Sequence, residues 1–419
     1  MSAPRPPGPA PARPRRNADD LRGLGKLAVE GVTGIADLVE AMHAAITHLP
    51  SALGRAAPSS TSGVPGLVYR GIRGVARRVG SGIDHSLRVV GPALGRGGLS
   101  PQREAAMAIA NGVLGDHLEA SGNPLAIEMS FRVDGLPLPR SRTALAARMR
   151  GARGQLLVQI HGLCMNDLQW RYRGHDHGQA LARELGYSCV QLHYNSGRHV
   201  SANGAEFAAL LEALVAAWPT PVDDLVLLCH SMGGLVARSA LDHAVGGKLA
   251  WATLPTRVVF LGTPHHGAPL ERAGSWVDTV VGLTPYSAPF VRLGKLRSAG
   301  IRDLRHGNLH GTRGRAGDGD PRADLRQRVS LPAHVQAFAV AASSGRAPAP
   351  GQAARGDGLV PIASALGQHR RRSLDLGIPR SRRWVGYGIG HLDMLGNQNV
   401  YRRILAWLRT PAVKGVPPE

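Results

Sequence analysis

The chain has 419 residues, 43% of them hydrophobic, and is therefore long enough to bury a sizeable core. Its net charge of +21 favours anionic partners. The basic residues are dispersed, however, aromatic residues make up only 4%, and no nucleic-acid-binding motif occurs. We therefore expect no specific nucleic-acid binding. No apolar run reaches the ~18 residues of a membrane span, and the first 20 residues lack the apolar segment of a secretory signal, so we expect a cytoplasmic protein.

Two helical stripes precede any strand-like pattern. Residues 1–20 are rich in Pro, Arg and Ala and are predicted to be a disordered tail, whereas residues 21–120 form a predicted helical region. Within it, apolar residues recur at helical spacing over residues 21–46 and 64–87, and more weakly over residues 101–118.

The second stripe is basic on its other face, with Arg70, Arg73, Arg77 and Arg78. Such a helix can pack on a neighbouring domain or lie on an anionic membrane. We expect this helix to pack on the neighbouring domain. The alternative is a weak, salt-sensitive membrane contact, which would make the protein peripheral to the membrane. The sequence does not specify an oligomeric state.

Residues 121–412 alternate strand-like and helical segments, which predicts an α/β domain with a mostly parallel central sheet and helices on both faces. The expected strands are residues 125–133, 155–161, 188–194, 224–229, 257–261, 333–341 and one near 383–387. The expected helices are residues 175–185, 202–218, 232–244 and 397–408.

The strongest functional signal is the run DLVLLCHSMGGLVARS at residues 224–239. An apolar strand enters a tight turn at Ser231, and a helix follows at once. This placement exposes the hydroxyl above the sheet edge and directs helix N-terminal amides at it, as a nucleophile requires. The usual pattern is G-x-S-x-G. Gly233 matches its second glycine, but Cys229 replaces the first.

A serine nucleophile needs a base and an orienting acid, which follow it in the order acid, then base. Asp357 in RGDGLVP and His391 in GIGHLDML follow Ser231 in that order, and glycines adjoin both. We assign them as acid and base, with Asp393 and Asp375 as alternative acids.

Three further histidines compete for the role of base. His230 adjoins the nucleophile and is expected to point elsewhere, while His265 and His266 follow the next strand, too early in the chain. Both are interpreted as loop residues that form local hydrogen bonds, with a place in the pocket wall as the alternative.

An oxyanion hole needs two preorganised amides. The N–H of Met232, directly after the nucleophile, is one candidate. The other is the N–H of Leu163, because the strand at residues 155–161 ends in a His-Gly pair that can turn the backbone back over the sheet.

These residues together resemble the lipase/esterase branch of the α/β-hydrolases, and they are similar to bacterial GPI inositol-deacylase-like lipases. The resemblance covers residues 124–410 and implies hydrolysis of carboxylic esters, often lipid esters, with the roles given above. It is carried by LLVQIHGLCMNDLQW, VQLHYNSGRHVSANG, LVLLCHSMGGLVARS, FLGTPHHGAPLERAG, GDGLVP and GHLDML.

Two features near the site allow more than one interpretation. Residues 268–331 form an insert, interpreted as a lid over the acyl pocket or as an ordinary surface excursion. The run His391, Leu392, Asp393 is similar to a lipase segment that helps to bind calcium, but the other ligands are not evident, so we expect no metal and no cofactor.

Cys164, Cys189 and Cys229 are expected to be buried thiols.

The sequence therefore predicts a serine hydrolase that acts on small-molecule or lipid esters through an acyl-enzyme. Two alternatives remain: an acyltransferase that uses the same three residues, and a non-catalytic membrane-associated protein built on a hydrolase scaffold.

Overall fold

The computed structural model describes residues 101–268, 298–309, 329–349 and 355–410, together with seven isolated positions between 22 and 81. The chain divides into two compact units. Arg13–Gly98 and Leu118–Ala126 make one of them, and the remaining residues make the other. The predicted tail, most of the two N-terminal stripes and most of the predicted lid lie outside the described residues.

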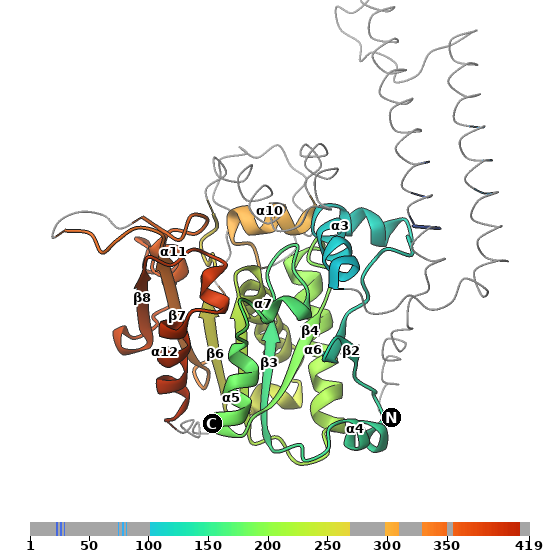
Figure 1. Ribbon diagram of the computed structural model, residues 1–419, viewed down its shortest axis with the longest axis horizontal. Coiled ribbons are helices and arrows are strands. Elements are labelled where there is room, and N and C mark those ends of the chain that lie inside the picture. The colour runs from blue at the N-terminus through green and yellow to red at the C-terminus, as the bar shows by residue number, and fades with distance from the viewer. Residues whose placement is uncertain are drawn as a thin grey trace, which may run out of the picture. The chain divides into compact units, whose positions relative to one another are not determined.

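An eight-stranded sheet forms the centre of the larger unit, in the order β2-β1-β4-β3-β5-β6-β7-β8 (Figure 1). All neighbouring strands from β4 to β8 are parallel, whereas β1 pairs antiparallel with β4 and with β2. The strands are β1 Ser130–Val133, β2 Leu136–Pro137, β3 Gln155–Ile160, β4 Ser188–His193, β5 Asp224–His230, β6 Thr256–Leu261, β7 Gln336–Ser343 and β8 Arg383–Tyr387.

Helices connect the strands and cover both faces of the sheet (Figure 1). The described helices are α3 Pro101–Ala120, α4 Arg142–Arg148, α5 His177–Leu185, α6 Val200–Ala217, α7 Met232–Gly246, α10 Ala299–His306, α11 Ile362–Ala365 and α12 Gln398–Leu408. The mostly parallel sheet, the four helices predicted for the catalytic domain and the weak helix at 101–118 are therefore confirmed.

Alternating side chains of the strands build two cores. One core packs β-strand residues such as Val226 and Val259 against Leu181 of α5 and Ile404 of α12. On the opposite face α6 packs against α7, and the two approach closely at Gly204, where a Cβ would lie 2.5 Å from the Cβ of Ser239. By length and composition alone α6 could cross a membrane, with a mean hydropathy of 1.3, and its packing against α7 accounts for that apolar composition.

The first strand is shorter than predicted, because residues 125–129 are not part of the sheet. Two of their backbone N–H groups bond to asparagine side chains: Leu125 N–H to Asn123 Oδ1 at 2.9 Å, and Ile127 N–H to Asn111 Oδ1 at 2.8 Å. Strand β2 was not predicted. It is formed through a two-residue turn with φ of 54° at Asp134 and 75° at Gly135, the geometry that Asp-Gly favours in hairpins.

Candidate active site

The turn between β5 and α7 holds Ser231 in an unusual backbone conformation, with φ 52° and ψ −123°. Its N–H donates to the carbonyl of Leu261 on β6 at 2.9 Å, which fixes this strained turn against the neighbouring strand. The side chain is 1% exposed, and Ser231 Oγ has no hydrogen-bond partner among the described residues. The hydroxyl is therefore available to another group.

Gly233 allows the helix to start this close to the sheet. A Cβ there would lie 2.2 Å from the carbonyl oxygen of Ile160 and 2.6 Å from that of His161, so a larger residue would displace β3. The predicted need for a small residue at this position is confirmed by the geometry.

The segment after β3 lies directly beside the turn at Ser231. A Cβ on Gly162 would lie 3.1 Å from the Cβ of Ser231, so the residue directly before Leu163 approaches the turn closely. The Leu163 N–H makes no hydrogen bond among the described residues. Met232 is the first residue of α7, and such amides have no intrahelical acceptor. Both predicted amides thus lie next to Ser231.

Two residues after β4 hold this segment in place, and sequence reasoning did not identify them. The Tyr194 hydroxyl donates to the His161 carbonyl at 2.8 Å, and its ring stacks on the His161 imidazole at 4.3 Å between centroids. Ser196 Oγ accepts from the N–H of Cys164, whose φ is +58°. The QLHYNS run offered no signal for this, because the contacts join segments about 30 residues apart.

Asp357 and His391 form a buried pair, 4% exposed each. A carboxylate only accepts, so His391 Nδ1–H donates to Asp357 Oδ2, at 2.7 Å. The other carboxylate oxygen accepts from the N–H groups of Leu359 and Val360, at 2.9 and 2.8 Å. Burial alone would raise the pKa of Asp357, but the charge and hydrogen bond of His391 and these two amides together lower it.

His230 links this pair to the turn at Ser231. Its Nε2–H donates to the His391 carbonyl at 3.1 Å, and the two rings lie 4.8 Å apart between centroids. Burial, and then the nearby His391, lower the pKa of His230 to about 3, so the ring is neutral. The structure thus brings Ser231, Asp357 and His391 to the same edge of the sheet, and it gives His230 a bridging position.

The other candidate residues have separate partners. Asp393 accepts from the Gly390 N–H at 3.1 Å and pairs with Arg173 at 3.0 Å, while Asp375 accepts from the N–H groups of His369 and Gly377. Within the described part of the chain, no group of three or more His, Cys, Asp or Glu could hold a metal ion. The three cysteines are buried and free, as predicted.

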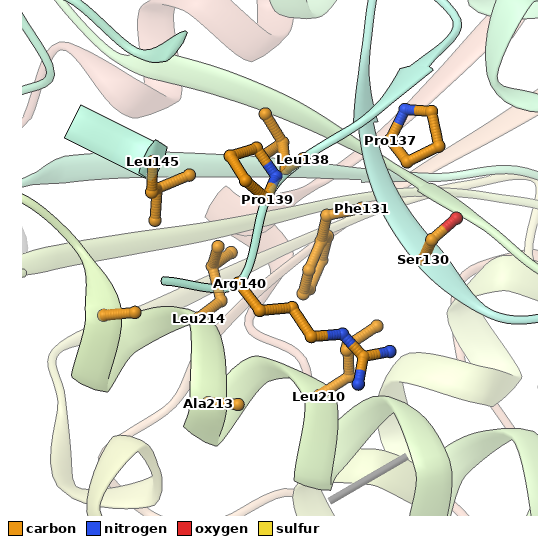
Figure 2. A pocket seen from close by; sticks show the side chains of 11 residues that line it. Ser130, Phe131, Pro137, Leu138, Pro139, Arg140, Leu145, Leu210, Ala213 and Leu214 are labelled. Carbon is orange, nitrogen blue, oxygen red and sulfur yellow. The ribbon is translucent and has the colours of Figure 1, made fainter. Parts of the chain in front are cut away.

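An apolar cavity of about 410 Å³ lies elsewhere in the fold (Figure 2). Phe131 of β1, Leu145 of α4 and Leu210 of α6 line it together with residues 137–140. None of the five predicted site residues lines this cavity, so it is separate from the candidate site.

Residues 153–286 match the family model of the PGAP1-like alpha/beta domain. This match includes Leu163, Ser231 and Met232 and ends before Asp357 and His391. No curated protein matches the chain.

Several solved structures are similar to the chain at low identity. The mature lipase BlEst2 of Bacillus licheniformis is 18% identical with a TM-score of 0.39, covering 68% of this chain and 98% of that one. Lipase B of Aspergillus fumigatus is 13% identical with a TM-score of 0.37, over 70% and 59% of the two chains. Esterase Pf2001 of Pyrococcus furiosus is 12% identical with a TM-score of 0.37, over 62% and 80%.

The strand order, the antiparallel start of the sheet and the strand–turn–helix at Ser231, together with the PGAP1-like match, identify the α/β-hydrolase fold. The predicted fold class and the resemblance to α/β-hydrolases are confirmed. The resemblance to GPI inositol-deacylases extends only to the family level.

Proposed function

We propose that the chain is a serine hydrolase that cleaves carboxylic esters, with Ser231 as nucleophile, His391 as base and Asp357 as orienting acid. One observation carries this proposal: a buried Asp357–His391 hydrogen bond of 2.7 Å lies beside a strained turn whose serine hydroxyl has no partner among the described residues. In serine hydrolases a buried carboxylate–histidine pair of this kind orients the base that takes the proton from the serine hydroxyl.

The hydrogen-bond directions define the proton transfers. Because His391 Nδ1–H donates to Asp357, the lone pair of Nε2 can take the proton of Ser231 Oγ as that oxygen attacks the ester carbonyl. The low pKa of Asp357 keeps its carboxylate ionised next to the imidazolium that forms. The proton then passes from Nε2 to the leaving alcohol, and water releases the acid from the acyl-enzyme by the same steps.

The oxyanion of the tetrahedral intermediate needs two donors that are already in position. We assign the N–H groups of Leu163 and Met232 to this role, supported by their positions close to Ser231. Removing one such donor in other enzymes costs on the order of 10²–10³ in kcat.

For the substrate, we propose small-molecule or lipid esters, supported by the PGAP1-like match over residues 153–286. We also propose a cytoplasmic protein whose membrane contact, through the basic N-terminal region, is weak and peripheral.

Labelling with a fluorophosphonate probe tests the nucleophile. Wild-type protein and Ser201→Ala, a control on helix α6, should label, and Ser231→Ala should not. Labelling of Ser231→Ala at the wild-type rate would refute the assignment. A series of nitrophenyl esters of increasing chain length, with and without an added alcohol, then gives the acyl preference and separates hydrolysis from acyl transfer.

A further inference from the structure

The apolar cavity of about 410 Å³ has no part in the proposed reaction, because none of the proposed catalytic residues lines it. Phe131 of β1, Leu145 of α4 and residues 137–140 form one part of its wall (Figure 2). Helix α6 forms another part with Leu210, Ala213, Leu214 and Ala217, whose spacing places them on one face of the helix. Helix α6 therefore borders the cavity with an apolar face.

The chemistry of the wall suits an alkyl chain. All the lining side chains except those of Ser130 and Arg140 are apolar, and no carboxylate is among them. Pro137 and Ala213 are exposed, so a ligand can enter without unfolding of the core. The volume is near the lower end of the roughly 300–1,000 Å³ that ligand pockets occupy, which suits one chain better than two.

Arg140 carries the only charge among the described lining residues. The residue is exposed, and Figure 2 shows its side chain extending past Phe131 toward Leu210 of α6. In the part of the chain that the structure describes, Arg140 forms no ion pair or hydrogen bond. Nearby Arg142, in contrast, donates from Nη2 to the Pro219 carbonyl at 3.1 Å. The guanidinium of Arg140 is thus available to an anion at the edge of an apolar cavity.

We infer that this cavity binds one medium-chain fatty acid, with the alkyl chain against the apolar wall and the carboxylate on Arg140. A guanidinium pairs with a carboxylate through two parallel N–H···O bonds, and an apolar wall favours a chain that leaves water. An uncharged hydrocarbon would leave Arg140 without a partner, and a short carboxylate would leave the cavity unfilled. Only the source of the ligand rests on the proposed function, since hydrolysis of a lipid ester releases such an acid.

Isothermal titration calorimetry of the full chain with sodium decanoate, below its micelle concentration, tests the role of Arg140. Wild-type protein should bind decanoate, and it should bind decanol about 3- to 10-fold more weakly, because the alcohol lacks the charge that pairs with a solvent-accessible arginine. Butyrate, which has the charge but little apolar surface, should show no measurable binding. Arg140→Gln should bind decanoate as weakly as the wild type binds decanol. Arg402→Gln, which removes an exposed arginine from α12, should bind it like the wild type.

A second pair of variants tests the cavity itself. Ala213→Trp places a large side chain at the exposed end of the cavity and should lose one bound decanoate per chain. Ala216→Trp adds the same side chain at an exposed position of α6 that does not line the cavity, and it should bind like the wild type. If Ala213→Trp does not fold, the exposed substitution Arg140→Gln still decides the outcome.

Photocrosslinking locates the bound acid, because decanoate is also a possible product at the catalytic site. A decanoate with a diazirine at the end of its chain should label residues 137–140 or 210–217 of the wild type, and Ala213→Trp should lose these labels in peptide mass spectrometry. The inference is wrong if the labels fall only elsewhere, if Ala213→Trp keeps them, or if decanol binds as tightly as decanoate. Neither readout uses turnover, so a chain without esterase activity, which would refute the proposed function, would still bind decanoate here.

Discussion

Gly262, the residue after β6, has a position that only glycine can occupy without disturbing the acid–base pair. Its φ is +57°, and a Cβ there would lie 2.4 Å from Met394 Cε, 3.2 Å from Asp357 Oδ2 and 3.2 Å from His391 Cε1. The methyl end of Met394 can move. Asp357 and His391 cannot move as easily, because the pair is buried and the carboxylate is held by two backbone amides.

Gly262→Ala should therefore lower both stability and turnover. The left-handed backbone costs an L-residue ~1–2 kcal/mol. A displacement of the acid–base pair by even part of an ångström adds a loss in kcat, which we place at about 10- to 100-fold since a 1 Å misplacement can cost 10². KM should change little, because the new methyl group contacts the acid–base pair.

Gly151→Ala is the matched control. Gly151 has φ +75°, and a Cβ there would have no atom within 4 Å, so its substitution carries the backbone strain without the contacts. Steady-state kinetics on a nitrophenyl ester and urea unfolding of both variants give the comparison. If Gly262→Ala loses the same stability as Gly151→Ala and keeps wild-type kcat, the space around the pair is not tight and the reasoning is refuted.

Three further outcomes are expected. Ser231→Ala should lower kcat by on the order of 10⁴–10⁶ with far-ultraviolet circular dichroism unchanged, and a smaller loss would point to another nucleophile. Tyr194→Phe should keep the ring stacking but leave the His161 carbonyl without its donor, which should cost about 1–3 kcal/mol in the free energy of unfolding measured with urea. It should also lower kcat more than it changes KM. An unchanged kcat would show that Tyr194 does not position the segment that carries Leu163. Burial, with smaller contributions from neighbouring groups, lowers the pKa of both His161 and His230 from 6.5 to about 3, so between pH 6.5 and 3 only the unfolded chain takes up these protons. The free energy of unfolding should therefore fall by up to ~1.4 kcal/mol per pH unit per histidine as the pH drops below 6.5. Urea unfolding at pH 7.5, 6.0 and 5.0 measures this, and a flat profile would contradict the burial of these two histidines as neutral rings.

The sheet was predictable because its strands are continuous apolar runs between polar turns. Strand β8 has the predicted bounds, Arg383–Tyr387, and β3 and β4 each differ by one residue. Ser231, Asp357 and His391 could be selected as candidate site residues for a related reason. Each follows a strand-like run in a glycine-containing loop, and the carboxyl ends of parallel strands meet at one edge of a sheet.

The supporting contacts could not be read from local patterns. From its neighbours in the sequence, Tyr194 would be assigned as one more apolar strand residue. Its hydroxyl nevertheless donates a hydrogen bond to the carbonyl of His161, 33 positions earlier. Arg238 reads as a surface residue of a helix. It is buried because α7 is enclosed along most of its length, which removes the amphipathic stripe that would have marked its inner face. Contacts between segments far apart in the sequence determine the environments of both side chains, and the local sequence pattern does not predict such contacts.

The wide spacing of the proposed triad along the chain has a consequence during synthesis. His391 lies 161 positions after His230, so the base is made roughly 10–30 s after the nucleophile turn at a translation rate of 5–20 residues per second. A ribosome-bound chain that has already folded β3, β4 and β5 around Ser231 therefore still has a serine without its base. Under the proposed mechanism, hydrolysis can begin only when β8 has joined the sheet, so the nascent protein is inactive until nearly the whole domain has been made.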